Sequence, residues 1–175
     1  MKCLNSLTNR IIQQFNCYAG FQTRVGYVDV KSSPVYFYVQ RYADGFNTTN
    51  TPIPFDVEKL NVGGTMNLTS GKFTAPLDGM YAFSVTGLAF LPTSSSNVYL
   101  QLYLYLNGNM IGRGVADQVN TAWQYETYSW QSTLNLQKGD EIWLEIFSMS
   151  TGAHLNGYSY TQFSGYLLEE KITVA

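Results

Sequence analysis

Hydrophobic and polar residues alternate along most of the chain after Val35, and this period of two predicts β-strands. The clearest strand, NVYLQLYLYLNG, places Val98 and four leucines on one face and three tyrosines with Gln101 on the other. It ends at Asn107–Gly108, a dipeptide typical of a two-residue hairpin turn, and the chain returns through NMIGRGV. The chain after Val35 is therefore expected to be all-β.

One segment, GMYAFSVTGLAFL, is apolar on both faces, which is unusual for a sheet with one face in water. One face must fill the core, and the other must meet another surface, for which a threefold copy of the chain is an economical candidate. Many short strands separated by glycine turns predict a sandwich or barrel, and a two-sheet jelly roll protects the sheet edges. The side chains expected to be mostly buried, in the sandwich or at the trimer interface, are Phe73, Tyr81, Phe83, Trp130, Leu134, Ile142, Leu144 and Leu167.

The first 33 residues differ from the rest, so we treat residues 1–33 as an N-terminal extension and residues 34–172 as the globular domain. Apolar residues in the extension have a loose three-to-four spacing, consistent with a short amphipathic helix or a disordered arm. Both cysteines, Cys3 and Cys17, lie here, and a disulfide within the chain, a disulfide between chains and two free thiols all stay open. No apolar run of signal-peptide length is present, so the chain is either cytosolic or a fragment whose leader was removed, and we favour the fragment.

Composition narrows the range of partners. Of the 175 residues, 45% are hydrophobic, which is enough for a core, and only 13% are charged. There are ten basic and twelve acidic residues, and Lys and Arg are scattered singly, so no basic stripe exists to neutralise a phosphate backbone. The longest apolar runs are strand-sized, which argues against a transmembrane helix. Neither nucleic-acid binding nor membrane insertion is expected.

The sequence offers little chemistry for catalysis. His154 is the single histidine and lies in STGAHLNGYS, which is expected to be an exposed loop where a histidine is usually only solvated. Neighbouring carboxylates such as Asp140–Glu141 point to opposite faces of a strand, so they cannot share one substrate. Two cysteines and one histidine are too few for a typical zinc site. We therefore expect no enzyme, no cofactor and no metal.

Two N-glycosylation sequons, Asn47-Thr48-Thr49 and Asn67-Leu68-Thr69, fall in segments expected to be loops or short connections. Exposed positions of this kind tolerate a glycan. The motif is short and arises often by chance, so Asn47 and Asn67 are candidates only.

Several segments resemble, in order, the globular head of complement C1q, a domain shared by cerebellins, adiponectin and many lectin-like invertebrate proteins. The matching segments between Pro34 and Lys171 are VYFYVQR, PIPFDVEKLNVGG, NLTSGKFTAPLDGMYAFSV, LYLNG, LNLQKGDEIWLEI and FSGYLL. The resemblance implies a ten-stranded jelly roll, similar to tumour necrosis factor (TNF), that packs into a secreted homotrimer and binds ligands without catalysis. Some family members bind calcium, but no motif in this chain carries a metal site over.

Three functions are consistent with such a fold to different degrees. The resemblance favours an extracellular recognition module that binds a protein receptor or a glycan. A structural assembly protein built from jelly-roll trimers would have the same fold, because fold alone does not decide function. A jelly-roll enzyme would need converging carboxylates or histidines, which the sequence does not offer.

The candidate ligand surface consists of five aromatic residues on two strands. Tyr99, Tyr103 and Tyr105 share the face opposite the leucines of their strand, and Trp143 and Phe147 share one face of another strand. In the C1q family fold these two strands lie in the same outer sheet, so the five rings would form one patch. The patch is either cross-strand pairing that only stabilises the sheet or a platform for a ligand.

Overall fold

The computed structural model describes residues 33–119 and 122–171 of the chain. Cys3, Cys17 and almost all of the extension predicted for residues 1–33 lie outside these residues, so their pairing and structure stay predictions. The strands of the described part are β1 (Tyr36–Arg41), β2 (Val57–Val62), β3 (Met66–Asn67), β4 (Lys72–Thr74), β5 (Gly79–Leu91), β6 (Val98–Leu106), β7 (Asn109–Gln118), β8 (Gln124–Leu136), β9 (Glu141–Met149), β10 (His154–Leu155) and β11 (Thr161–Glu170).

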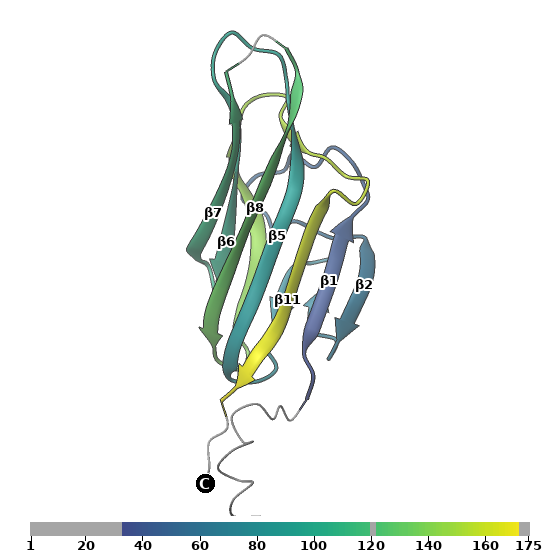
Figure 1. The fold of residues 1–175 in the computed structure, drawn as a ribbon, viewed down its shortest axis with the longest axis vertical. Coiled ribbons are helices and arrows are strands. Elements are labelled where there is room, and N and C mark those ends of the chain that lie inside the picture. Colours follow the sequence, from purple (N-terminus) through teal and green to yellow (C-terminus); the bar gives the residue numbers. More distant parts are fainter. Residues whose placement is uncertain (1–32, 120–121, 172–175) are drawn as a thin grey trace, which may run out of the picture. The chain divides into compact units, whose positions relative to one another are not determined.

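The strands form two antiparallel sheets (Figure 1). Sheet A has the order β10-β5-β11-β1-β2, and β8 pairs with β5 along the edge opposite β11. Sheet B has the order β3-β4-β9-β6-β7. The predicted all-β, two-sheet sandwich is confirmed. One short strand was not foreseen, because β10 lies in the segment that was expected to be an exposed loop and pairs with Ala89 and Phe90 of β5.

The local pattern of the sequence explains the longest strands. In β5, buried and half-buried residues alternate without exception from Gly79 to Leu91, as the period of two requires. The turn between β6 and β7 contains Asn107 and Gly108 with φ of 49° and 85°. A two-residue hairpin of this kind needs positive φ at both positions, which asparagine and glycine tolerate best.

Aromatic rings from both sheets meet in the core. Phe37 of β1 lies 5.2 Å from Phe73 of β4 and 5.0 Å from Phe163 of β11, measured between ring centroids. Phe73 in turn contacts Phe83 of β5 at 5.5 Å. The predicted core residues Phe73, Tyr81, Phe83, Ile142, Leu144 and Leu167 are all buried. These contacts hold β1, β5 and β11 of sheet A against β4 of sheet B.

Two residues of the predicted core are only half-buried. Trp130 and Leu134 lie on β8 at the edge of sheet A, where they pack against the core from one side. A Cβ atom placed on Gly114 of β7 would lie 2.4 Å from the ring of Trp130. Glycine at this position therefore allows the indole of β8 to lie directly against β7, which covers this side of the sandwich.

Candidate functional site

The outer face of sheet B brings four of the five predicted aromatic residues together. β6 and β9 are neighbours in this sheet, and their register pairs Tyr105 directly with Trp143. The rings of Tyr103 and Phe147 are stacked at 4.3 Å and 6°, and those of Tyr105 and Trp143 at 5.7 Å and 12°. Tyr99 lies on the same strand nearer its start, where it pairs with Asp117 of β7. We refer to these five aromatic residues as the sheet B patch.

Trp143 is the least accessible member of the sheet B patch. Tyr105 approaches its ring from β6, and the Nζ atom of Lys72 lies 4.4 Å from the ring centroid, approaching from β4 on the other side of β9. The indole Nε1 donates a 2.7 Å hydrogen bond to Glu145 Oε1. Only 8% of Trp143 is exposed as a result. This residue therefore supports its neighbours more than it offers surface to a ligand.

The remaining members of the patch face water to different extents. Phe147 is 42% exposed, and the three tyrosines are half-buried. Burial raises the pKa of the Tyr105 hydroxyl, and the nearby Glu145 and Tyr103 raise it further, so the phenol stays neutral at physiological pH. Beside the rings, Ser148 Oγ donates to Gln101 Oε1 at 3.1 Å. The face thus combines stacked rings and neutral hydrogen-bonding groups with Glu145 and, on β7, the exposed charges of Arg113 and Asp117.

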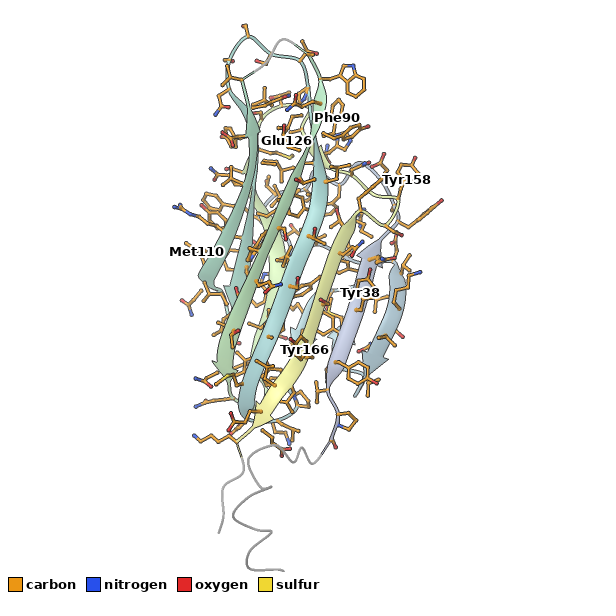
Figure 2. The ribbon with its side chains drawn as sticks, viewed as in Figure 1. Tyr38, Phe90, Met110, Glu126, Tyr158 and Tyr166 are labelled. Atoms are coloured by element: carbon orange, nitrogen blue, oxygen red, sulfur yellow. The ribbon has the colours of Figure 1, made fainter. Side chains whose placement is uncertain are left out.

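The outer face of sheet A also carries exposed apolar side chains, and sequence reasoning identified only those that β5 contributes. Tyr36 of β1 pairs directly with Tyr166 of β11, and they are 39% and 50% exposed. Leu60 of β2 and Leu168 of β11 are further exposed apolar side chains of these strands. Tyr38 and Tyr166 mark this face in Figure 2. Apolar side chains on the outer face of β5 are therefore joined by others on β11, β1 and β2, with the polar Ser84, Thr86 and Ser164 among them.

A small polar network crosses the same face. The hydroxyl of Tyr38 donates a 2.9 Å hydrogen bond to Gln162 Oε1 of β11 and accepts one from Gln40 Nε2. These bonds link β1 to β11 through side chains. Tyr38, Gln40 and Gln162 are thus paired with each other, and exposed apolar side chains such as Tyr36, Leu60 and Tyr166 lie on the same face.

His154 does not lie in an exposed loop, which corrects the prediction. It is half-buried in β10, and its ring stacks on Phe90 at 4.8 Å and 22°. Trp123 and Tyr125 pack around the same Phe90 ring. The alternation of GMYAFSVTGLAFL already put Phe90 in phase with Met80 on the outer face, so this aromatic cluster was partly readable from the sequence.

The described residues hold no group of three or more histidine, cysteine, aspartate or glutamate side chains placed to bind a metal ion. Asn47 is exposed in the loop after β1, as expected for a sequon. Asn67 is also exposed, but it is the second residue of β3 and its Oδ1 atom accepts a hydrogen bond from Ser70 N at 3.0 Å. Of the two candidate glycosylation positions, Asn47 is therefore the one in a loop.

Comparison with known protein families identifies one domain. The family model for the C1q domain matches residues 36–168. Complement C1q tumor necrosis factor-related protein 3 of Mus musculus is 32% identical over 129 residues, which are 73% of this chain and 49% of the relative. Complement C1q tumor necrosis factor-related protein 2 of Homo sapiens is 33% identical over 119 residues, 67% of this chain and 39% of the relative. The chain thus spans about half the length, or less, of the curated relatives that it matches.

Solved structures share the fold. The globular domain of zebrafish complement 1qA protein superimposes with a TM-score of 0.59 at 19% identity, covering 78% of this chain and 99% of that domain. Eiger TNF from S. frugiperda also has a TM-score of 0.59, at 10% identity, covering 82% of this chain and 98% of its own. The two-sheet sandwich is therefore a jelly roll of the kind found in both proteins. Within the described residues, no helix is long and apolar enough to cross a membrane.

Proposed function

The chain belongs to the C1q domain family, and from this premise we propose that it is a secreted, non-enzymatic recognition module. In this proposal the chain assembles as a homotrimer and binds an extracellular protein or a glycan. The observation that carries the assembly is the apolar outer face of sheet A, which includes Tyr36, Leu60 and Tyr166. Contiguous apolar patches on soluble proteins tend to mark interaction sites, and in this proposal the face is covered by further copies of the chain.

The sheet B patch is the proposed ligand surface. It lies on the opposite outer face of the sandwich, so assembly through sheet A leaves it accessible. Exposed Phe147, half-buried tyrosines and the hydrogen-bonding groups of Gln101 and Ser148 offer both apolar and polar contacts. Such a mixed surface suits a protein or a glycan. No cofactor is part of the proposal.

Two measurements test this function. Sedimentation velocity at micromolar concentration should show three chains per particle, and a well-folded monomer would contradict the assembly. Glycan-array and receptor-capture screens with the soluble protein should then identify a ligand, with and without added calcium to test for a metal requirement. A stable trimer that captures nothing in either screen would favour the alternative of a purely structural assembly protein.

A further inference from the structure

Two loops at one end of the β1–β11 pair form a rigid unit that displays exposed tyrosines. Arg41 at the end of β1 pairs with Thr161 at the start of β11, so residues 42–45 and residues 156–160 meet beyond the pair. Tyr42 is 59% exposed and Tyr158 is 58% exposed. Their rings contact each other edge to face, with centroids 5.6 Å apart at 77° (Tyr158 is labelled in Figure 2). We refer to Tyr42 and Tyr158 as the loop tyrosine pair.

The backbone beneath this pair is strained. Tyr158 and Ser159 both have positive φ, 51° and 65°. A bulky residue rarely adopts this left-handed conformation, and two in succession are rarer still. Such strain persists only where the surrounding structure enforces it, and it is concentrated at functional sites.

Hydrogen bonds and close packing from the facing loop enforce the conformation. Tyr158 N donates to Tyr42 O at 2.8 Å, and Ser159 N donates to Arg41 O at 3.0 Å. Gly157 N donates to Asp44 Oδ1 at 2.7 Å. A Cβ atom on Gly157 would lie 2.4 Å from Tyr42 O, so only glycine fits there. The backbone that carries the two rings is therefore held in place before any partner arrives, which lowers the entropy lost on binding.

The electrostatics of the two loops favour a cationic partner. Two carboxylates, Asp44 in the first loop and Asp56 after it, interact electrostatically with Arg41 at the end of β1. Arg41 is already engaged, because its Nη1 donates to Pro54 O at 2.9 Å and its guanidinium lies 4.7 Å from the Phe46 ring centroid. Both carboxylate oxygens of Asp56 accept backbone N–H groups. Asp44 is exposed, and its Oδ2 atom accepts no hydrogen bond from any described residue.

We propose that the loop tyrosine pair and Asp44 bind an arginine side chain presented by a basic segment of a partner protein. A planar guanidinium stacks on a tyrosine ring and pairs with a carboxylate, which a lysine ammonium does less well. An uncharged glycan can donate hydroxyl hydrogen bonds to Asp44 but lacks the charge attraction of a guanidinium, and an anionic surface is repelled by it. The site lies in loops outside the sheet B patch, so it goes beyond the proposed function and stands whether or not that patch binds a ligand.

The test measures binding of two fluorescent eight-residue peptides to the full chain by fluorescence anisotropy. One peptide alternates glycine and arginine, and the other alternates glycine and lysine. We expect the arginine peptide to bind at least about five-fold more tightly than the lysine peptide. Tyr158→Asn should weaken binding of the arginine peptide about ten-fold, because asparagine keeps the left-handed backbone but removes the ring. Asp44→Asn should also weaken binding, since it removes the charge and keeps an oxygen for Gly157 N.

Controls separate the site from general effects. Tyr125→Asn removes a ring that is 48% exposed on β8, and it should leave affinity for the arginine peptide unchanged. Tyr42→Ser provides a second test of the pair if Tyr158→Asn lowers the melting temperature.

Equal binding of both peptides, or full affinity in both tyrosine variants, would overturn the proposal. If neither peptide binds, and a glycan binds the chain but not the Tyr158→Asn variant, the proposal is overturned in favour of a carbohydrate site. Sedimentation reports on the trimer separately, so the two proposals fail independently.

Discussion

The outer faces of both sheets carry aromatic side chains, but these side chains are exposed to different extents on the two faces. On sheet B, the register places an aromatic ring beside an aromatic ring, so that Tyr105 stacks on Trp143 and leaves it 8% exposed. On sheet A, Tyr166 pairs with Tyr36 on one side and with Ala82 on the other, and it stays 50% exposed. Alternating tyrosines therefore do not by themselves make a binding face. An aromatic cross-strand neighbour is not enough either, because Tyr36 and Tyr166 pair directly and both stay exposed; whether the rings stack decides how far they cover each other.

The largest expected effect follows from placing a charge on the outer face of sheet A, where Tyr166 is exposed. Tyr166→Glu should abolish the proposed trimer, because a carboxylate buried without a partner costs about 3–5 kcal/mol. Sedimentation velocity at micromolar concentration should then show single chains. The matched control is Phe147→Glu, which places the same charge on the sheet B patch and should leave three chains per particle. Dissociation of both variants, or of neither, would remove the distinction between the two faces.

A core substitution tests the inner side of the strand that carries the sheet B patch. Leu144 lies between Trp143 and Glu145 on β9 and points inward, where it is 1% exposed. Leu144→Ala should lower the free energy of unfolding by about 2–5 kcal/mol, the range for a large-to-small change in a core. Chemical denaturation measures this loss. A decrease below about 1 kcal/mol would mean that the inner and outer faces of β9 are assigned wrongly.

Removing the stacked tyrosines asks whether the sheet B patch is structural or also binds a ligand. Tyr103→Ser combined with Tyr105→Ser should cost about 0.2–1 kcal/mol for each cross-strand pair lost, because exposed pairs contribute modestly. Thermal denaturation gives the cost, and capture of an identified ligand gives the function. Unchanged capture would make the patch purely structural, whereas loss of capture from a stable trimer would establish it as the binding surface.

The smallest effect concerns the charge beside the stack. Lys72 Nζ lies 2.8 Å from Glu141 Oε2, and both side chains are partly exposed. Lys72→Met keeps an aliphatic chain against Trp143 and removes the ion pair, so stability should change by less than about 1 kcal/mol. Denaturation at low and high salt checks this expectation. A larger, salt-dependent loss would show that charge, rather than ring stacking, holds this part of sheet B.

The architecture was largely predictable because strand formation leaves local signals. Alternation along β5 and β6, the Asn107–Gly108 hairpin and the inward phase of Ile142 and Leu144 all follow from a period of two and from turn chemistry. The sheet B patch was also foreseen, but only with the family fold, because the sequence does not state that β6 and β9 are neighbours. Ring stacking and the low exposure of Trp143 depend on the register between those strands, which alternation does not set.

What the sequence determined by itself is the set of residues on each face of each strand. Which faces meet, and which stay uncovered, was decided by pairings between segments far apart in the chain. His154 lies in a strand because β10 pairs with β5, and Tyr42 contacts Tyr158 because β1 pairs with β11. The physical reason is that side-chain alternation is a local property of the extended backbone, whereas pairing and register minimise the energy of the whole core.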